Sequence, residues 1–504
     1  MTMTRFSVWA PEAARLRVRI DGVDHPMALD AGGWWRTNVE CAAHGTDYMY
    51  LLDDSDEPLP DPRSRWQPYG VHGPSRTYHH AAFPWTDQEW TGRDLAGGVV
   101  YSVRVGAFTP DGTFDAAIAR LDHLADLGVD VVELHPVNIE RGSAHHSACW
   151  YTPHPSYGGP DGLKRFVDAC HARGIAVVLD LAYDHLQPGA GAHRIGPYLA
   201  EVANTWGHTL ALDGPHGAGM RSFITDNVLM WLRDYHADGV RLDAAHTLID
   251  RDAMRLLDEL SAAVSALSID LGRPLALIAG SGLAGARFIP GPGADLAELL
   301  APSAGGAAGI PALDRDHRAE FGSLEQLFGI LRAGFSTVLS TDRPTTAFSP
   351  GLLRIGATLL LTAPSTPVLQ MGEEWAARMP FPPEWAGVKT PTLGALDWSE
   401  LDKAEHRDML DLHRRLIALR RSQPDLASPV LRRSDVWHGG SFLAIRRGCC
   451  VVVANLRRTP QRVNLHGTAR TVLAATEPGL VLVHDAADLP GESAAVIACC
   501  RFDR

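Results

Sequence analysis

The sequence lacks the features that mark several large classes of protein. It has no apolar run of about 18 residues or more, the length that a membrane-spanning helix needs, and its first residues have no apolar core of the kind found in a secretion signal. Positive charge is not in excess either, because 46 Lys and Arg stand against 59 Asp and Glu, for a formal net charge of -13. Nucleic-acid binding relies on clustered basic side chains. Neither nucleic acid nor membrane is therefore an expected partner, and we expect a cytoplasmic protein with an uncharged small-molecule substrate.

Disulfide, metal and nucleotide signatures are also missing. The cysteines number seven, an odd set with adjacent pairs at Cys449/Cys450 and Cys499/Cys500, and they show neither a disulfide framework nor CxxC metal spacing. No glycine-rich phosphate fingerprint follows the first strand of the central region, which weakens a dinucleotide-binding alternative. We read the cysteines as reduced packing residues, and we expect no cofactor and no bound metal.

What is present divides into three parts, since 504 residues are too many for one hydrophobic core. Residues 1–95 alternate polar and apolar positions in short runs, such as Arg5 to Trp9 and Leu16 to Ile20, which predicts an N-terminal β-sandwich of the immunoglobulin-like, carbohydrate-binding-module-like kind. Residues 425–504 alternate again and predict a C-terminal β domain. Trp85 and Trp90 lie in a predicted linker at the end of the first part. Exposed aromatic side chains there can stack on sugars, but packing between domains is the favoured interpretation.

The central part, residues 96–424, repeats a strand followed by a helix. Such repeats predict a parallel sheet, and close to eight of them favour a (β/α)8 TIM barrel in the α/β class over an open sheet. The predicted strands are Val99 to Val105, Val129 to Pro136, Ile175 to Tyr183, Val240 to Ala245, Leu275 to Ala279, Phe335 to Ser340 and Thr366 to Gln370, with an eighth near Asp295 to Leu300. The predicted helices are Phe114 to Leu127, Gly162 to Arg173, Phe223 to His236, Asp252 to Leu267, Leu324 to Ala333, Pro350 to Leu361 and Glu405 to Ser422.

The stretch at residues 238–246, Asp-Gly-Val-Arg-Leu-Asp-Ala-Ala-His, carries the strongest chemical signal. Val240 and Leu242 alternate with Arg241 and Asp243, so the two charged side chains share one face of a buried strand. A nearby positive charge keeps a carboxylate ionised, so this Asp can act as a nucleophile. A buried ion pair that only fixes the strand is the other interpretation.

Other ionisable side chains fall at the predicted carboxyl ends of different strands, where barrel enzymes place their chemistry. A purely structural ring of charges would be more stable if it were apolar, so we expect a functional site. Its members are His135, Asp180, Tyr183, Asp184, His185, Arg241, Asp243, His246 and Asp342. Glu373 and Glu374 follow the last strand, and we assign them to structure.

Several of these runs resemble the α-amylase family, glycoside hydrolase family thirteen. The matching runs are Phe6 to Pro11, Val105 to Thr113, Val132 to Val137, Tyr157 to Asp168, Asp180 to His185, Gly239 to His246 and Met371 to Trp375. Within the family, the N-terminal sandwich and the runs Gly112 to Ile118 and Tyr157 to Leu163 are similar to the maltooligosyltrehalose trehalohydrolase branch. The resemblance implies a retaining glycosidase.

The resemblance also implies roles for single residues. Asp243 would be the nucleophile, with Arg241 keeping it ionised, and Asp342 would hold the hydroxyls of the sugar being transferred. Asp180 and His185 would shape the subsite for that sugar. Tyr183, His135 and His246 are expected to be further substrate contacts.

The chain departs from the family pattern at chemically decisive positions. Gly280 stands at the end of the fifth strand, where the family carries the Glu that protonates the leaving oxygen. Thr341 replaces a His before the third carboxylate, and Asp184 replaces an Asn. The pair His145 and His146 aligns with a sugar-binding Tyr-Asp. A retaining glycosidase needs both a nucleophile and an acid, so ordinary hydrolysis is expected to be weak.

Three interpretations stay open. In the first, the protein is a carbohydrate-active enzyme of altered mechanism, whose leaving group needs no acid or whose acid comes from elsewhere, such as Asp295 or Glu298. In the second, the barrel has been recruited to different chemistry by Asp243 with a cluster of His145, His146, Asp184 and His185, which could also bind zinc or iron if it is not simply a polar loop. In the third, the protein is a catalytically silent homologue that binds glucan or another protein.

Overall fold

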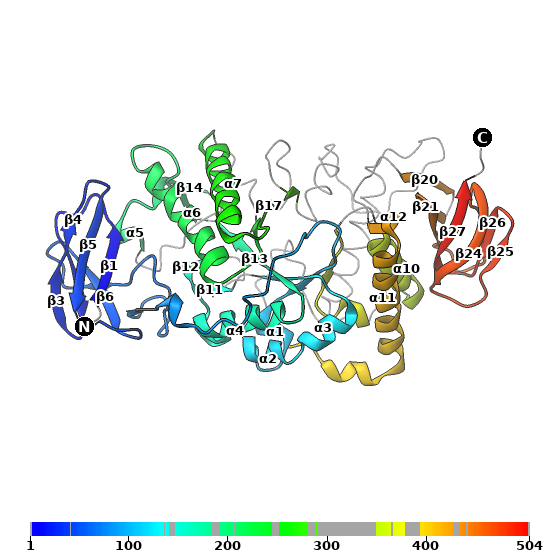
Figure 1. The fold of residues 1–504 in the computed structure, drawn as a ribbon, viewed down its shortest axis with the longest axis horizontal. Helices are drawn as coiled ribbons and strands as arrows, with labels where there is room; N and C mark the ends of the chain where they lie inside the picture. The colour runs from blue at the N-terminus through cyan, green and yellow to red at the C-terminus, as the bar shows by residue number, and fades with distance from the viewer. Residues whose placement is uncertain are drawn as a thin grey trace. The chain divides into compact units, whose positions relative to one another are not determined.

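The computed structural model describes residues 3–40, 42–135, 137–140, 147–183, 192–204, 207–243, 251–279, 289–290, 349–363, 366–378, 394–427, 434–439 and 442–501. The chain forms two compact units (Figure 1). The first unit holds Met1–Arg93, Arg104–Leu121 and Glu133–Gly291, and the second holds Asp94–Val103, Asp122–Val132 and Pro292–Arg504. The three-part division at residues 95 and 424 stays a prediction.

The first unit begins with two antiparallel sheets. One has the order β1 (Met3–Trp9), β5 (Trp34–Glu40), β4 (Ala28–Leu29), and the other β3 (Val23–Pro26), β2 (Leu16–Ile20), β6 (Asp47–Leu52), β7 (Pro58–Leu59), with β8 (Ser75–Arg76) also paired to β6. Alternate residues of β2 are buried, as the period of two in its sequence requires. The buried side chains of both sheets, Phe6, Leu16 and Trp35 among them, form one core. The two predicted strands are confirmed.

Parallel strands follow in the order β18 (Ile289–Pro290), β17 (Ala276–Ala279), β16 (Gly239–Asp243), β13 (Ala176–Ala182), β10 (Val131–Leu134), and only the last two residues of β10 belong to this unit. Residues 176–181 of β13 and all of β10 are buried, the pattern expected of strands covered on both faces. The helices of this unit are α1 (Val105–Phe108), α2 (Phe114–Ile118), α4 (Gly159–His171), α5 (Ala192–Ile195), α6 (Gly217–Asp234) and α7 (Arg251–Leu271), with a 3-10 turn η2 (Pro155–Tyr157). Two hairpins were not predicted: β11 (Asn138–Glu140) with β12 (Ser147–Pro153), and β14 (Leu199–Asn204) with β15 (Gly207–Leu210).

Helix α6 begins at Gly217, six residues before the predicted start at Phe223. The sequence Gly-Ala-Gly is typical of a loop, but here the missing side chains of the two glycines make room for neighbouring atoms. A Cβ added to Gly219 would lie 2.2 Å from Cζ2 of Trp9, and a Cβ added to Gly217 would lie 2.2 Å from the carbonyl oxygen of Leu212. Gly219 therefore allows the first turn of the helix to contact β1, and Gly217 allows it to lie against the preceding segment at Leu212. The predicted helix Phe114 to Leu127 is divided into α2 and α3 (Leu121–Leu127).

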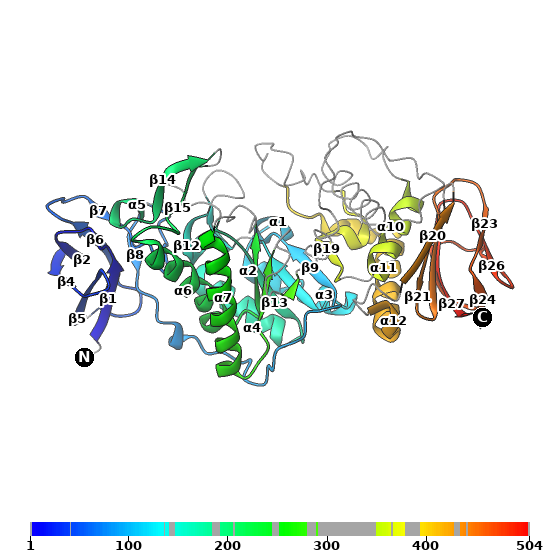
Figure 2. The ribbon, with the colours of Figure 1, turned by 90° about the horizontal axis from the view of Figure 1, so that it is seen from above.

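The second unit combines a parallel strand pair with helices and a terminal antiparallel domain (Figure 2). Strand β9 (Val100–Val103) pairs in parallel with β19 (Val368–Gln370). The helices are α3, α10 (Pro350–Thr362), α11 (Ala404–Ser422) and α12 (Pro424–Ala427), with 3-10 turns η5 (Glu373–Trp375) and η7 (Trp398–Asp402). The predicted strands near Asp295 and at Phe335 to Ser340, and the predicted helix Leu324 to Ala333, lie outside the described residues.

The terminal domain has two antiparallel sheets. Their orders are β20 (Ser434–Gly439), β21 (Phe442–Arg447), β22 (Cys450–Asn455), β27 (Ser493–Arg501), β24 (Gly467–Ala475), and β23 (Gln461–Asn464), β26 (Ala486–Leu489), β25 (Val481–Val483). Buried Val453, Val463 and Ile497 belong to its separate core, and the predicted β domain is confirmed as β structure. In the described part of the chain, no helix is long and apolar enough to cross a bilayer.

Candidate functional site

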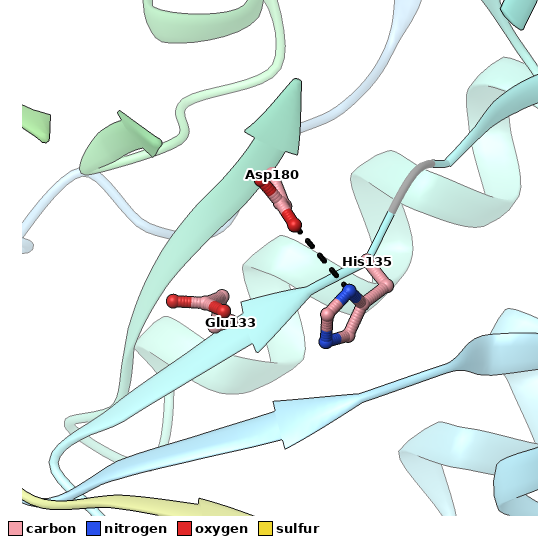
Figure 3. Close-up of side chains that lie close together, drawn as sticks. All are labelled: Glu133, His135 and Asp180. Atoms are coloured by element: carbon pink, nitrogen blue, oxygen red, sulfur yellow. Dashed lines mark ion pairs between the residues drawn. The ribbon is translucent and has the colours of Figure 1, made fainter. Parts of the chain in front are cut away.

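The carboxyl ends of three parallel strands bring four ionisable side chains together. Strands β13 and β16 pair in register, so Asp180 lies opposite Arg241 and Ala182 opposite Asp243. Glu133 and His135 come from β10 and from the residue just beyond its end. Figure 3 shows these two side chains on one strand and Asp180 on its neighbour. We call Glu133, His135, Asp180 and Arg241 the strand-end cluster.

Arg241 is the centre of this cluster. Its Nη1 donates a hydrogen bond to Glu133 Oε1 at 2.8 Å and lies 3.6 Å from Asp180 Oδ2. The same Asp180 oxygen lies 3.3 Å from His135 Nδ1. Glu133 and Asp180 are 3% and 4% exposed, so both carboxylates have lost nearly all of their water and depend on the guanidinium and the imidazole for compensation.

The charge on Asp180 follows from these contacts. Burial alone would raise the pKa of this carboxyl, but the positive charge of Arg241 and the hydrogen bond to His135 hold it below its ordinary value, with Arg104 contributing in the same direction. Asp180 is therefore an anion at neutral pH. Its second oxygen, Oδ1, is buried and accepts no hydrogen bond from any residue that the structure describes. Leaving a buried acceptor unsatisfied costs free energy, so such an atom is a candidate for contact with a ligand.

Three members of the cluster could in principle hold a metal ion. Glu133, His135 and Asp180 each offer one ligand atom, and these atoms lie within 4.8 Å of one another. However, the guanidinium of Arg241 already lies between the two carboxylates and supplies the positive charge that an ion would bring. A metal would have to displace it. The arrangement fits an ion-pair network that orients Arg241 better than it fits a metal centre.

The structure brings some of the predicted site residues together, and it places others elsewhere or does not describe them. His135, Asp180 and Arg241 lie together, and Asp243 ends the strand that carries Arg241. Tyr183 is buried next to α6, where its hydroxyl donates to Asn227 Oδ1 at 2.5 Å and its ring meets Trp150 edge-on. The other predicted positions, which are His145, His146, Asp184, His185, His246, Gly280, Thr341 and Asp342, lie outside the described residues.

Glu133 was missed by the sequence reasoning. It is a single carboxylate within the apolar run Val131–Leu134, in the same way that Arg241 is a single cation within its own strand. A charge inside a fully buried strand must have a partner. That rule would have found Glu133 before the structure did.

A second buried charge cluster was also missed, and it lies at the opposite end of β16. Asp238, the residue before this strand, is 1% exposed and accepts hydrogen bonds from Val177 N at 2.8 Å, Trp90 Nε1 at 2.8 Å and Arg273 Nη1 at 2.7 Å. His171 Nε2 lies 3.0 Å from its Oδ2. Each of these four groups can donate a hydrogen bond to the carboxylate.

His171 joins Asp238 to a second carboxylate, Asp87. Its Nδ1 lies 2.8 Å from Asp87 Oδ2, and Asp87 also contacts His236 Nδ1 at 2.9 Å. Burial alone would lower the pKa of His171, but its hydrogen bonds to Asp238 and Asp87 raise it above its ordinary value. Both ring nitrogens face carboxylate oxygens, and only the doubly protonated imidazolium can donate to both. We call Asp87, His171 and Asp238 the His171 bridge.

The two tryptophans next to Asp87 belong to this assembly. Trp90 stacks on His171 with ring centroids 4.5 Å apart, and Trp85 stacks on His236 at 3.7 Å. Both side chains pack against histidines of the same unit, and packing between domains stays a prediction. They fix the segment around residue 87 to the end of the parallel strands, which in barrel enzymes is the end concerned with stability.

Comparisons with known proteins agree with this architecture. Residues 81–190 match the family described as Alpha amylase, catalytic domain. A putative alpha amylase from Salmonella typhimurium, known from a crystal structure, has 25% sequence identity and a TM-score of 0.78, with 98% of each chain covered. A pullulanase from Anoxybacillus sp. LM18-11, solved with maltotetraose, has the same fold at 17% identity and a TM-score of 0.72, with 99% of this chain and 86% of that chain covered. The protein is thus of the α-amylase class, with a (β/α)8 barrel and flanking β domains, as the sequence predicted.

Curated relatives narrow the class further. The malto-oligosyltrehalose trehalohydrolase of Mycobacterium tuberculosis is 36% identical over 98% of this chain and 99% of its own length. That of Arthrobacter ramosus is 37% identical, with the same coverage of both chains. The chain belongs to the malto-oligosyltrehalose trehalohydrolase family, and the resemblance found in the sequence is confirmed.

Proposed function

We propose that this protein is a carbohydrate-active enzyme of the retaining α-glucosidic type whose mechanism lacks the usual proton donor. In this proposal Asp243 attacks the anomeric carbon and forms a covalent glycosyl intermediate. Because Gly280 has no carboxyl group, no side chain at this position can protonate the oxygen of the leaving group. Its substrate is a neutral oligosaccharide or a sugar derivative. Release of trehalose from a malto-oligosyltrehalose, the reaction named for the relatives, is then slow.

The observation that carries the proposal is the position of Arg241. Its guanidinium is held by Glu133 and Asp180 on the two neighbouring strands, and Asp243 follows two residues later on the same strand. Successive strand residues alternate between faces, so residues 241 and 243 share a face. A cation fixed in this way favours the ionised, nucleophilic form of a nearby carboxyl. A silent barrel would have no need to retain this network, because a buried ion pair adds little stability compared with apolar packing.

The expected size of the defect follows from the missing step. General acid catalysis contributes about 10²- to 10⁴-fold, or on the order of 3 to 5 kcal/mol of barrier, when the leaving group is another sugar. It contributes little to formation of the glycosyl intermediate when the leaving group departs without a proton, as fluoride does. In the second step the same group is the base that activates water, so the fluoride reaction is run with added azide, a nucleophile that needs no base. Comparing the two kinds of substrate therefore separates the contribution of the nucleophile to the rate from that of the acid.

The test compares fluoride release from α-maltosyl fluoride in the presence of azide with release of trehalose from maltotriosyltrehalose. The wild-type protein is expected to release fluoride readily and trehalose slowly, and Asp243→Asn is expected to abolish both reactions. Gly280→Glu is expected to raise the rate of trehalose release by about 10²-fold or more while changing fluoride release in azide little. Gly282→Glu, two residues away, is the matched control and should restore nothing.

Two results would contradict the proposal. Rapid trehalose release by the wild-type protein would mean that another group supplies the proton. Fluoride release in azide that is absent from the wild type, or unchanged in Asp243→Asn, would exclude a covalent intermediate at Asp243. The second result combined with retained binding of maltooligosaccharides would favour a silent, glucan-binding protein.

A further inference from the structure

A closed surface loop at residues 66–76 presents one exposed aromatic ring. The backbone N–H of Arg76 donates to the carbonyl of Trp66 at 2.9 Å, which joins the two ends of the loop. Inside it, Gly70 N bonds Gln67 O at 3.3 Å and Gly73 N bonds Gly70 O at 3.2 Å, so two turns follow each other. Compact loops with joined ends are frequently functional. Tyr69, inside this loop, is 61% exposed.

The conformation of the loop depends on glycine at two positions. Gly70 has φ = +79°, which side-chain-bearing residues rarely adopt. A Cβ at Gly73 would lie 2.5 Å from the Cβ of Tyr69, so only glycine allows the chain to return beside this residue. The buried amide of Gln67 fills the loop and reaches the carbonyl of Gly73 at 3.5 Å. The backbone of Tyr69 is therefore held in place.

The ring of Tyr69 is fixed as well, although it is exposed. Arg76 lies between two aromatic rings, with its Cζ 5.2 Å from the centroid of Tyr69 and 4.9 Å from that of Trp66. Its Nη2 donates to the hydroxyl of Tyr69 at 2.8 Å. Asp47 anchors the same guanidinium by bonds of 2.6 and 3.0 Å. One face of Tyr69 is therefore backed by a cation held in place by a carboxylate.

This ring differs from the other aromatic side chains of the same unit that attracted attention in the sequence. Trp85 and Trp90 are stacked on histidines and are satisfied within the protein. Among the large apolar side chains that are exposed in the described part of the chain, Tyr69 is the only aromatic one. His44, also exposed, continues the surface beside it through ring contacts with Trp66 at 5.8 Å and with Tyr78 at 5.2 Å.

We propose that Tyr69, Trp66 and His44, with the polar edges of Arg76 and Asp47, form a surface-binding site for a neutral α-glucan chain, separate from the strand-end cluster. A sugar ring presents C–H bonds on one face and hydroxyls at its edge, which matches a fixed aromatic face bordered by a guanidinium and a carboxylate. A tyrosine offers such contact area at a low cost in conformational entropy. The net charge of -13 disfavours nucleic acid as the ligand. The choice of glucan as the ligand rests on the proposed function, and the geometry of the site does not.

The test is affinity electrophoresis of the full-length protein in gels that contain glycogen. The wild-type protein is expected to be retarded, and Tyr69→Ala is expected to weaken the apparent affinity for glycogen about three- to tenfold, the range of one aromatic contact. Tyr69→Phe is the matched control: it keeps the ring, loses only the bond to Arg76, and should retain most of the retardation. Rates of fluoride release from α-maltosyl fluoride in azide should be equal in the three proteins.

Several outcomes would overturn this inference. Equal retardation of Tyr69→Ala and wild type would exclude the ring from binding, as would absence of retardation in the wild type. Equal losses in Tyr69→Phe and Tyr69→Ala would assign the effect to the bond with Arg76 instead of to stacking. Failure of fluoride release in all three proteins would count against the proposed function alone, because glycogen retardation is measured without turnover.

Discussion

Replacing His171 by Phe would test how much of the first unit depends on the His171 bridge. Phenylalanine preserves a flat ring that can stack on Trp90, but it donates nothing to Asp87 or Asp238. The substitution therefore removes a cation from between two carboxylates whose side chains are 4% and 0% exposed. His236 would still contact Asp87, and Arg273 would still contact Asp238.

The magnitude follows from the burial of these groups. Removing one partner of a buried ion pair costs about 3 to 5 kcal/mol, because the remaining charges stay desolvated. Arg273 and His236 compensate in part, so the lower end of this range is the better estimate. A loss of about 3 kcal/mol raises the population of the locally opened state roughly a hundredfold.

The pH dependence has a sign that can be worked out from the two shifted groups. The pKa of His171 is raised in the native state, so its contribution to stability is complete below the unfolded value of about 6.5 and is lost as pH rises through the native value. The pKa of Asp87 is held well below its ordinary value by His171 and His236 against the effect of burial. Its contribution is present above about pH 3.9 and disappears as pH falls through the native value. Stability should fall at both extremes in the wild type, and the alkaline fall should be absent from His171→Phe.

Hydrogen exchange followed by mass spectrometry is a suitable assay, because a chain of several domains does not unfold in two states. The amide of Val177 donates to Asp238, so peptides that cover residues 176–182 report directly on the bridge. His216→Phe is the control, since His216 also pairs with a carboxylate, Glu12, but on the surface. Protection that falls less than tenfold in His171→Phe, or equally in both variants, would refute the idea that the bridge secures this end of β16.

Two further predictions concern the strand-end cluster and the packing of α6. Glu133→Gln removes the charge that holds Arg241 at 2.8 Å, a charge-assisted bond worth about 1.5 to 3 kcal/mol, so kcat/KM for α-maltosyl fluoride should fall about tenfold or more; an unchanged value would mean that Arg241 does not need this partner. Gly219→Ala forces a methyl group against Trp9 and should lower the melting temperature, with an overpacking cost of about 1 to 3 kcal/mol. Gly394→Ala is the control and should not lower it, because no described atom lies within 4 Å of the added Cβ. Equal melting temperatures of the two variants would show that the helix moves away without cost.

Much of the fold could be predicted because the relevant signals are local. Strands β2 and β13 follow directly from a period of two and from a continuous apolar run. The first turn of α6 could not be predicted, because the reason for glycine at position 219 is a tryptophan more than two hundred residues earlier in the chain. A glycine that permits close approach and a glycine that forms a loop look the same in a sequence.

In the candidate sites, too, some features could be predicted from local sequence and others could not. Asp180 and Arg241 could be predicted from their positions near strand ends, because parallel strands bring their carboxyl ends to one edge. The partnership of His171 with Asp87 and Asp238 could not, since the three residues are separated by 84 and 67 positions and no periodicity connects them. Proximity between distant segments is a property of the folded chain.

The two ends of β16 carry opposite kinds of polar cluster, and the contrast bears on function. At its start, Asp238 accepts from a backbone amide, an indole and a guanidinium, and the imidazolium of His171 completes its shell. Toward its end, Asp180 on the neighbouring strand has one buried oxygen that, among the described residues, meets no hydrogen-bond donor. A cluster that served only stability would satisfy both oxygens, as the His171 bridge does, because an unpaired buried acceptor is costly. The incomplete shell of Asp180 therefore distinguishes the strand-end cluster from the His171 bridge, and it supports the proposal that this cluster contacts a ligand.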